Sequence, residues 1–379
     1  MNKKSICFIG VNPNLEGGIS NYQKNIIKYI QLKEENANIS WVYKSKVKED
    51  YSKEDINYVG LKVINIPFID DFIFNRKVRR YLGNNYFDII NSHAIWGYWM
   101  KNYKRRNNQT LINTYHGASF PYYKVHLRRF GIIKKILLSP LLLYSYLIEK
   151  PPIKNANKII CVSEKVKRQI EETYSKRKDI FVVRTGVNLE DFKQRDKSKI
   201  RKEIGLEKGR IYGLHVAKGG YWIKGLDRVV NISEEIYKKD PNYRLIVIGP
   251  NYEKNKKFLN KKFIISLEKV SRERIPLYYS ASDMFFCLSR YEGGAPTLVT
   301  SESMASGCLL VCSKDSEQEI IEDDKNGLII EKFDKNDAEK VMNILNNKKK
   351  KEEIIRNSIK TIKEFSLEKW GKRYMDVLK

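Results

Sequence analysis

The chain contains no long apolar run. Its longest candidate, Ile136–Ile148, includes Pro140 and directly follows two lysines, whereas a membrane-spanning helix needs about 18–20 consecutive apolar residues. We therefore expect no transmembrane segment. The first residues pass straight into a strand-like run, Lys4–Ile9, so we also expect no signal peptide.

Cysteine is scarce and shows neither paired nor metal-ligand spacing. All five cysteines stand in apolar, strand-like runs: Cys7, Cys161, Cys287, Cys308 and Cys312. Such thiols are typical of reduced core residues, and disulfide-free chains of this kind are typical of the cytosol. The sequence therefore predicts a cytoplasmic protein.

Acidic side chains are absent between Asp88 and Glu149, although the whole chain carries a formal net charge of +27. Nine basic residues fall in the same stretch: Lys101, Lys104, Arg105, Arg106, Lys124, Arg128, Arg129, Lys134 and Lys135. Basic residues beside an apolar, aromatic-containing helix favour docking on anionic lipid. A general lysine bias with the helix packed in a core stays open as an alternative, and so does nucleic-acid binding. No zinc-finger, helix-turn-helix or RNA-binding signature supports the last.

At 379 residues the chain is long enough for two α/β domains. Short apolar runs alternate with helical stretches, which indicates βα units and parallel sheets. The expected strands are Ile39–Tyr43, Val63–Ile66, Phe87–Asn91, Thr110–Thr114, Lys158–Val162 and Ile180–Val183, then Ile211–Val216, Arg244–Ile248, Phe263–Ser266, Asp283–Ser289, Cys308–Cys312 and Gly327–Ile330. A helix is also expected near Glu317–Glu322.

This alternation predicts four parts. A first domain spans residues 1–192, and a charged, core-poor linker spans residues 193–209. A second domain follows at residues 210–360. A terminal helix at residues 361–379 carries aromatic side chains that need a surface to bury on, and we expect that surface on the first domain.

The most informative stretch is Tyr291–Gly307, which begins where an apolar run ends. It contains two glycines and a proline, then a small-residue helix from Thr297, and two carboxylates, Glu292 and Glu302, bracket it. A loop at the carboxyl end of a parallel strand that feeds a helix N-terminus is where open α/β sheets bind phosphorylated ligands. The alternative is two surface glutamates on a buried helix.

Two further loops end at candidate residues. Gly17 and Gly18 precede a helix that begins near Ile19, and they let the backbone approach a ligand. The loop is neither GxGxxG nor a Walker loop, so a dehydrogenase or P-loop enzyme has no support. His93 and His116 each follow a strand end. A lone histidine is usually structural, and His116, followed by Gly117, is the better candidate for contacting a substrate.

Taken in order, these segments resemble the retaining glycosyltransferases of family 4, across essentially the whole chain. The matching segments are Gly17-Gly18, His116-Gly117, Cys161–Glu164, Gly186–Phe192, Lys224-Gly225, Tyr278–Asp283, Glu302–Gly307, Glu319 and Asn326-Gly327. The resemblance implies the GT-B fold, with two Rossmann-like parallel-sheet domains facing a central cleft and a C-terminal helix that crosses back to the first domain.

The chain departs from the family pattern at three places. Lys218 stands where the family has an arginine, which keeps a positive charge but loses the bidentate fork. Thr185 replaces an asparagine. Glu292 and Glu302 have nine residues between them, where the family has seven. Either the chain bulges around Ala295-Pro296, or Glu292 is not the carboxylate that reaches the sugar.

The resemblance implies a hexosyltransferase-type enzyme (EC 2.4). It would move a sugar, with retention, from a nucleotide-diphosphate sugar to a hydroxyl of a lipid-linked or glycan acceptor in cell-surface polysaccharide or glycoconjugate synthesis. Catalytic roles are implied for His116, Glu292 and Lys224. Donor-binding roles are implied for Gly17, Gly18, Lys218, Lys224, Gly249, Glu292, Gly294, Pro296, Thr297, Leu298 and Glu302. The expected co-substrate is a nucleotide-sugar, UDP-linked rather than GDP-linked, with no cofactor.

No Asp-x-Asp motif occurs in the chain, so a metal-dependent GT-A mechanism has no ligand set and we expect no metal. The acid-free first domain would face the acceptor, which predicts an anionic membrane surface as partner and a peripheral position on the inner face of the cell membrane. Two alternatives stay open. One is a non-catalytic GT-B sugar-binding or partner subunit, and the other is a basic nucleic-acid-binding protein.

Overall fold

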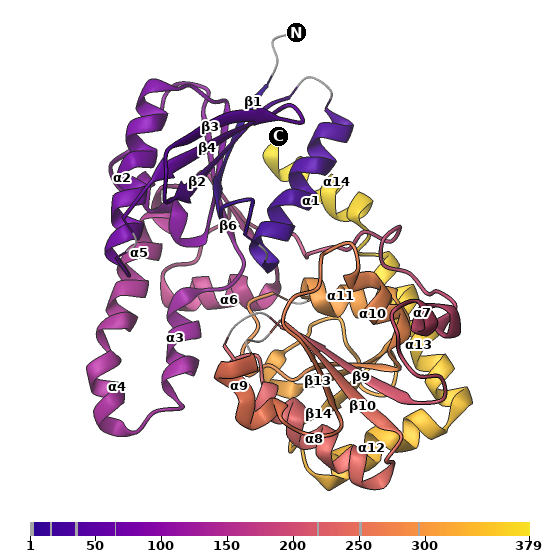
Figure 1. The fold of residues 1–379 in the computed structure, drawn as a ribbon. Helices are drawn as coiled ribbons and strands as arrows, with labels where there is room; N and C mark the ends of the chain where they lie inside the picture. Colours follow the sequence, from indigo (N-terminus) through magenta and orange to yellow (C-terminus); the bar gives the residue numbers. More distant parts are fainter. Residues whose placement is uncertain are drawn as a thin grey trace. The chain divides into compact units, whose positions relative to one another are not determined.

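The computed structural model describes residues 4–15, 17–34, 37–64, 66–217, 220–249, 252–294 and 296–379. The chain divides into two compact units (Figure 1). Unit 1 comprises Met1–Arg184 and Trp370–Lys379, and unit 2 comprises Thr185–Lys369. Each unit is built around its own sheet with helices on both faces, the arrangement in which parallel strands are buried.

Unit 1 contains an eight-stranded sheet with the order β3-β4-β2-β1-β5-β6-β7-β8. Neighbouring strands are parallel, as predicted for this domain, except that the edge strand β3 pairs antiparallel with β4. The strands are β1 (Ser5–Gly10), β2 (Asn38–Ser45), β3 (Glu49–Lys53), β4 (Ile56–Lys62), β5 (Ile89–His93), β6 (Thr110–Tyr115), β7 (Lys158–Cys161) and β8 (Ile180–Val182).

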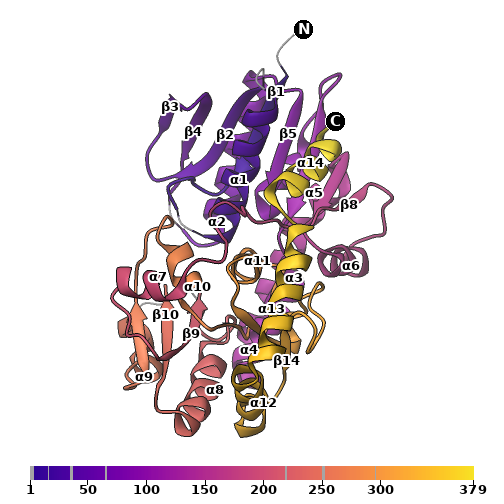
Figure 2. The same ribbon diagram turned by 90° about the vertical axis from the view of Figure 1, so that its right-hand side faces the viewer.

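The helices of unit 1 cover both faces of this sheet (Figure 2). They are α1 (Gly18–Lys33), α2 (Ile69–Asn84), the 3-10 helix η1 (Ala94–Asn102), α3 (Ser119–Leu127), α4 (Ile132–Leu138), α5 (Pro140–Asn155), α6 (Glu164–Thr173) and α14 (Leu367–Leu378). Asn91 of β5 donates to the Tyr374 hydroxyl of α14, whereas its neighbour Ser92 accepts from the Trp99 indole of η1 at 2.8 Å. Successive strand residues point to opposite faces, so α14 and η1 lie on opposite sides of β5.

Unit 2 contains a six-stranded parallel sheet with the order β11-β10-β9-β12-β13-β14. Its strands are β9 (Ile211–Val216), β10 (Tyr243–Ile248), β11 (Ile264–Leu267), β12 (Met284–Cys287), β13 (Leu309–Ser313) and β14 (Leu328–Ile330). Its helices are α7 (Lys197–Glu203), α8 (Leu226–Lys239), α9 (Tyr252–Leu259), α10 (Ile275–Ala281), α11 (Leu298–Ala305), the 3-10 helix η2 (Lys314–Ser316), α12 (Lys335–Asn346) and α13 (Lys348–Lys363).

The period-2 pattern of β12 explains the two-sided core of unit 2. Met284 and Phe286 join the apolar cluster under α8 and α12, whereas Phe285 and Cys287 join the cluster under α10 and α11. A strand buried on both faces is a continuous apolar run, as the sequence of β12 is.

The sequence predicted a linker at residues 193–209, but these residues are part of unit 2. They contain α7, in which Ile200 and Arg201 are buried. The Arg201 guanidinium donates to Ala281 O at 2.9 Å and to Asp283 Oδ2 at 2.7 Å. Charge-rich composition was misleading here because a buried arginine with matched acceptors packs like a core residue.

The terminal segment 361–379 is also not one helix. α13 ends at Lys363 and α14 begins at Leu367. Between them the backbone of Val187 donates to Phe365 O at 2.9 Å and accepts from Leu367 N at 2.8 Å. The segment is thereby divided, with Trp370–Lys379 in unit 1 and the residues before it in unit 2.

Two smaller predictions are wrong. Strand β4 lies at Ile56–Lys62 rather than at 63–66, and residue 65 lies outside the described residues. Residues 317–322 are irregular backbone with a turn at residues 319–320 rather than a helix, since Glu317 has a left-handed φ of 45° and Asn326 donates to Ile320 O at 2.9 Å. Among the described helices, none is both long and apolar enough to cross a bilayer.

Candidate functional site

The candidate site of unit 2 is at the carboxyl edge of its sheet, where the strand order reverses. β9 and β12 are neighbours, with β10 and β11 on one side and β13 and β14 on the other. The loops that leave β9 and β12 therefore lead away from each other. In open α/β sheets this switch point is where ligands bind. Lys224 follows β9, and Glu292 follows β12.

The turn that carries Lys224 is fixed against the loop after β12. Gly225 has φ +70°, and a Cβ there would lie 2.0 Å from Leu288 O, so only glycine fits. Arg290 donates from its backbone to Ile223 O at 2.8 Å, and its guanidinium forms a bidentate pair with Asp227 at 2.8 and 2.6 Å. These contacts hold the start of α8, and with it Lys224, beside the β12 loop.

Lys224 and Glu292 form an ion pair across the switch point. The Lys224 ammonium donates to both Glu292 oxygens, at 2.8 and 2.9 Å. The Ser289 hydroxyl donates to Glu292 Oε1 at 2.6 Å, and Ser289 O in turn accepts from the Ser313 hydroxyl at 2.7 Å. Glu292 is buried, whereas 35% of the Lys224 side chain is exposed. The lysine is therefore the member of the pair that solvent and a solute can reach.

His215, at the end of β9, lies near this pair. It is buried, and its ring Nδ1 lies 3.1 Å from Phe286 O, which fixes Nδ1 as the protonated nitrogen. The pKa of His215 is lowered to about 4, chiefly by burial and also by Lys224, while the Phe286 carbonyl and Glu292 oppose the shift. The imidazole is neutral at physiological pH, so it adds no positive charge beside Lys224.

Helix α11 begins at the same edge, and Thr297 caps it by accepting from Thr300 N at 3.2 Å. Glu302, in the second turn, is buried, and its Oε1 accepts from the Arg272 guanidinium in the loop after β11. Its Oε2 is buried and has no hydrogen-bond partner among the described residues. Burial raises the pKa of Glu302, and Arg272 opposes that rise.

The structure brings some of the residues selected from the sequence into contact, and leaves others separate. Lys224 is paired with Glu292, whereas Glu302 forms its own pair with Arg272. Gly249, with φ +102°, directly follows β10 at the same carboxyl edge, and its N donates to Leu267 O at 2.9 Å. The neighbouring donor-site candidates Gly294, Pro296 and Leu298 lie in the β12 loop and the first turn of α11. Lys218 and Ala295, where the sequence predicted a diphosphate contact and a bulge, lie outside the described residues.

In unit 1 the order of strands also reverses between β1 and β5. Gly17 and Gly18 follow β1, and Gly17 caps the N-terminus of α1 without a side-chain hydrogen bond. A Cβ added at either glycine would meet no described atom within 4 Å. Packing within the described residues therefore does not require glycine at either position.

His93, the last residue of β5, and His116, which follows β6, contact each other. His93 Nδ1 lies 2.7 Å from His116 Nε2, with the rings nearly parallel. The Tyr22 ring packs on His116 in a T-shaped arrangement, with the two ring centroids 4.5 Å apart. Burial lowers the pKa of His116 to about 3 and that of His93 well below its usual range. Both are neutral at physiological pH, and His93 is a buried partner of His116 rather than an isolated structural residue.

Glu149 is a second residue near His116 that the sequence did not reveal. It is buried in α5, and its carboxylate accepts from Ser119 N at 2.9 and 3.0 Å, from the Ser119 hydroxyl at 2.7 Å and from the Tyr174 hydroxyl at 2.8 Å. Ser119 begins α3, three residues after His116. Burial raises the pKa of Glu149 to about 7. Its only signal in the sequence is being the first acid after a long acid-free stretch.

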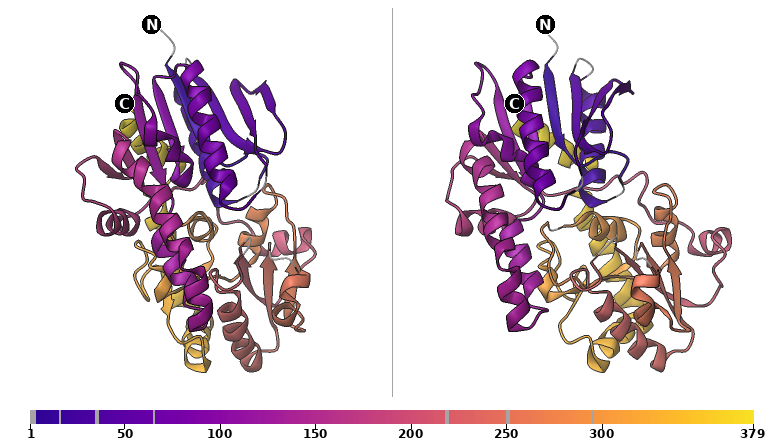
Figure 3. Two further views of the ribbon diagram at one scale, coloured as in Figure 1. Left: turned by 90° about the vertical axis from the view of Figure 1, so that its left-hand side faces the viewer. Right: turned by 60° about the vertical axis from the view of Figure 1, so that its left-hand side comes forward.

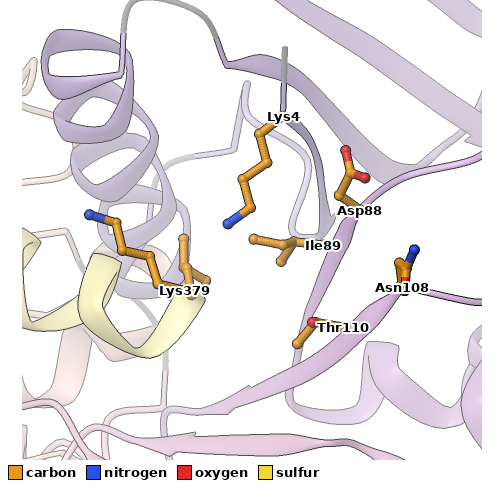
Figure 4. Close-up of a pocket in the computed structure, with 7 residues that line it drawn as sticks. Lys4, Asp88, Ile89, Asn108, Thr110 and Lys379 are labelled. Atoms are coloured by element: carbon orange, nitrogen blue, oxygen red, sulfur yellow. The ribbon is translucent and has the colours of Figure 1, made fainter. Parts of the chain in front are cut away.

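A pocket of about 370 Å³ lies at the opposite, amino edge of the unit 1 sheet (Figure 4). Lys4 precedes β1, Asp88 precedes β5 and Thr110 begins β6, so the pocket lies at the strand ends where α/β sheets do not place ligands. Asp88 is already used, accepting from Ser5 N at 2.8 Å. Among the described residues, no group of three or more His, Cys, Asp or Glu side chains has the arrangement of a metal site.

Comparison with known proteins identifies the family. Residues 31–191 match the family model described as Glycosyltransferase Family 4, and residues 196–361 match the one described as Glycosyl transferases group 1. The two matches fall on the two sheets and together cover most of the chain. The chain belongs to the family 4-type glycosyltransferases.

Curated relatives of this glycosyltransferase match over part of their length. An uncharacterized glycosyltransferase of Methanocaldococcus jannaschii, MJ1178, is 30% identical over 223 residues, which are 57% of each chain. Alpha-monoglucosyldiacylglycerol synthase of Acholeplasma laidlawii is 26% identical over 166 residues, 41% of each chain. The chain thus spans less than two thirds of the length of these relatives.

Solved structures match over nearly the whole chain. Sucrose-phosphate synthase from Thermosynechococcus elongatus superposes with a TM-score of 0.82 at 17% identity, covering 99% of this chain and 98% of that one. HepE of Anabaena in complex with UDP-glucose superposes with a TM-score of 0.73 at 14% identity, covering 99% of both chains. At these identities the likeness shows the fold, which is GT-B, and the predicted fold class is confirmed.

Proposed function

We propose that this glycosyltransferase moves a sugar from a nucleoside-diphosphate sugar to a hydroxyl of an acceptor, with retention of anomeric configuration. The observation that carries the proposal is the convergence at the switch point of unit 2. A partly exposed cation, the N-terminus of α11 and two buried carboxylates lie at the same carboxyl edge; Glu292 is in the β12 loop and Glu302 is in α11. The first two suit a diphosphate, and the carboxylates suit hydroxyl groups.

The diphosphate is the leaving group, and negative charge develops on it as the bond to the sugar breaks. Lys224, Lys218 and the N-terminus of α11 would stabilise that charge, an effect that is worth a few kcal/mol of barrier for a positioned donor. Since Lys224 donates to Glu292 in this structure, a diphosphate would share or replace that partner.

The carboxylates and His116 would fix the donor. We assign Glu302 to the ribose hydroxyls and Glu292 to hydroxyls of the transferred sugar, and His116 to orienting that sugar. The acceptor hydroxyl forms the new bond to the anomeric carbon, the bond from that carbon to the diphosphate breaks, and the acceptor proton passes to the leaving phosphate oxygen. This sequence needs no protein base, and we propose a metal-independent reaction without a cofactor.

UDP-sugars are the first donors to test, because the fold neighbour HepE was solved with UDP-glucose. The test is slow release of UDP from UDP-glucose, UDP-galactose and UDP-N-acetylglucosamine, with GDP-, ADP- and CMP-sugars beside them. We expect release from at least one donor, lost in Lys224→Ala. Lys325→Ala is the matched control, because Lys325 also pairs with a glutamate, Glu322, at 2.7 Å, but both are exposed.

The outcomes separate the two classes of function. Release that Lys224→Ala abolishes and Lys325→Ala keeps supports the enzyme. Binding of a nucleotide-sugar without release under any condition would favour a non-catalytic GT-B subunit. Absence of both binding and release across the panel contradicts the proposal.

We further propose that unit 1 docks on an anionic membrane surface on the inner face of the cell membrane, where a lipid-linked or glycan acceptor is presented for polysaccharide or glycoconjugate synthesis. Helix α4 continues along the line of α5 (Figure 3). Apolar side chains on these helices are 50–75% exposed: Ile132, Ile133, Ile136, Leu137, Leu143 and Leu147. Basic side chains are interspersed with them, and the stretch contains no acid before Glu149. Exposed apolar groups beside cations fit anionic lipid.

Liposome co-sedimentation tests this docking. Each lysine near an anionic surface is worth about 1 kcal/mol, so Lys134→Glu with Lys135→Glu should weaken binding to phosphatidylglycerol-containing vesicles roughly 30-fold or more. Lys348→Glu with Lys349→Glu is the matched control, an exposed pair on α13. Equal weakening by both pairs, or tighter binding to RNA or DNA than to vesicles, would contradict the membrane proposal.

A further inference from the structure

The environment of Glu302 is unusual because its two oxygens have different surroundings. Oε1 accepts from the Arg272 guanidinium, whereas Oε2 is buried and has no hydrogen-bond partner among the described residues. A buried acceptor without a partner costs about 1–3 kcal/mol, more when it is charged. Native proteins retain few such groups, and a functional role is one reason to retain them.

Arg272 is held in place from its other side. Its guanidinium lies 4.9 Å from the ring centre of Phe192, and the turn that carries it is closed by Arg274 N and Ile275 N, which donate to Ser271 O at 3.0 and 3.2 Å. The side chain is 37% exposed, and the carboxylate beneath it is buried. Arg272 therefore neutralises a charge that burial alone would disfavour.

We propose that Arg272 is a positioning residue for nucleotide binding, which orients Glu302 by occupying Oε1 and leaves Oε2 to accept hydrogen bonds from the ribose hydroxyls. This proposal rests on the function proposed above and adds a residue to it. Arg272 stands in the loop after β11, outside every segment that resembles the family pattern. It acts on the nucleotide through Glu302.

A consequence is that the effect of Arg272 depends on the ribose hydroxyls. Hydrogen bonds to a charged acceptor are worth about 1.5–3 kcal/mol, which corresponds to a 10- to 100-fold preference for UDP over 2′,3′-dideoxy-UDP. Loss of Arg272 should reduce that preference. If Arg272 had a merely structural role, its loss would weaken the binding of both nucleotides equally and leave the ratio of their affinities unchanged.

The test is calorimetric titration of the full chain with UDP and with 2′,3′-dideoxy-UDP, or with the matching pair of another base if the donor screen selects one. Arg272→Gln should lower the affinity for UDP about 10-fold and bring the ratio near one, and Arg272→Lys should restore part of it. Arg274→Gln is the matched control, since it removes an exposed positive charge two residues away. The ratio of affinities for UDP and dideoxy-UDP in this control variant should equal that of the wild type.

A double-mutant cycle shows whether Arg272 acts through Glu302. In a Glu302→Gln background, Arg272→Gln should have no further effect on the ratio. The Tyr279 hydroxyl, which is close enough to lower the pKa of Glu302, is the rival donor to Oε2. If Tyr279→Phe rather than Arg272→Gln changes the ratio, the proposal is wrong.

Failure of this inference and failure of the proposed function look different. If the wild type binds UDP but does not distinguish it from the dideoxy nucleotide, Oε2 is not a ribose acceptor. This inference and the assignment of Glu302 to the ribose then fail, while sugar transfer from a nucleotide donor stands. If Arg272→Gln unfolds, Arg272→Lys carries the comparison. If the wild type binds no nucleotide of any base, both proposals fail.

Discussion

Lys224 and Glu292 stabilise each other at the switch point, since the ammonium of one contacts both oxygens of the other. Removing one partner leaves a buried charge without compensation, which costs about 3–5 kcal/mol when the pair is fully buried. The Lys224 side chain is 35% exposed, so solvent screens part of that loss.

We therefore expect Lys224→Ala to lower the free energy of unfolding by about 1–3 kcal/mol, measured by urea denaturation. The double variant Lys224→Ala with Glu292→Gln should recover much of this loss, because the uncompensated charge is gone. If the single and double variants are equally unstable, the pair does not stabilise the carboxylate.

The raised pKa of Glu149 predicts that the stability of the protein depends on pH. Burial raises its pKa from 4.5 to about 7. Between these values the folded chain holds a proton that the unfolded chain has lost, so the contribution to stability is complete below pH 4.5 and is lost as pH rises through 7. Hydrogen bonds from Ser119 and Tyr174 to the carboxylate oppose the shift.

Glu149→Gln keeps the shape of the protonated acid and removes the titration. Between pH 5 and 8 we expect the wild type to lose stability relative to this variant, by up to about 3 kcal/mol, as measured by thermal unfolding. His116 and His215 titrate in the opposite sense, but they are present in both chains and cancel. The stability of Glu172→Gln, a substitution at an exposed position, should change with pH in parallel with that of the wild type. A constant difference across the range would contradict the prediction.

At the scale of elements, the hydrophobic pattern of the sequence was sufficient to predict a strand where that strand is buried on both faces. β12 and β13 are continuous apolar runs, and their predicted bounds differ from the observed ones by one or two residues. β3 has no such signal, because Glu49–Lys53 is polar and mostly exposed and pairs only at the sheet edge. α7 was missed because its buried residue Arg201 looks like solvent-exposed charge in a sequence.

The sequence predicted which residues belong to the candidate site, but not which of them form ion pairs with each other. Lys224, Glu292 and Glu302 were selected from their places at strand ends, which the sheet order supports. The pairing of Lys224 with Glu292 joins residues 68 positions apart, and that of Arg272 with Glu302 joins residues 30 positions apart. Both depend on how neighbouring loops meet, which no local pattern encodes.

The close packing of helix α14 on α1 leads to a prediction about stability. A Cβ at Gly371 would lie 2.3 Å from the ring of Tyr29 on α1, so this glycine sets how closely the two helices approach. Gly371→Ala should destabilise the protein by about 1–3 kcal/mol through overpacking, measured by urea denaturation. Gly83→Ala in α2 is the control, since a Cβ there meets no described atom within 4 Å. It should be neutral or stabilising by about 0.5–1 kcal/mol.

At the scale of the whole molecule, two sheets that each reverse their strand order have different surroundings at their carboxyl edges. Unit 2 offers ion pairs that suit a diphosphate and a ribose. Unit 1 offers a neutral histidine pair and an acid-free helical segment with exposed apolar side chains. Vesicle binding that persists when nucleotide is added would agree with these being separate functions, whereas competition between the two ligands would not.

The most direct test of a donor site at the switch point is hydrogen exchange with and without UDP, at a concentration that saturates binding. We predict slower exchange in three segments of unit 2: residues 220–226, 268–274 and 288–302. The same segments should lose that protection in Lys224→Ala. Protection confined to the amino-edge pocket around Lys4, Asp88 and Asn108, or protection unchanged by Lys224→Ala, would contradict a donor site at the switch point.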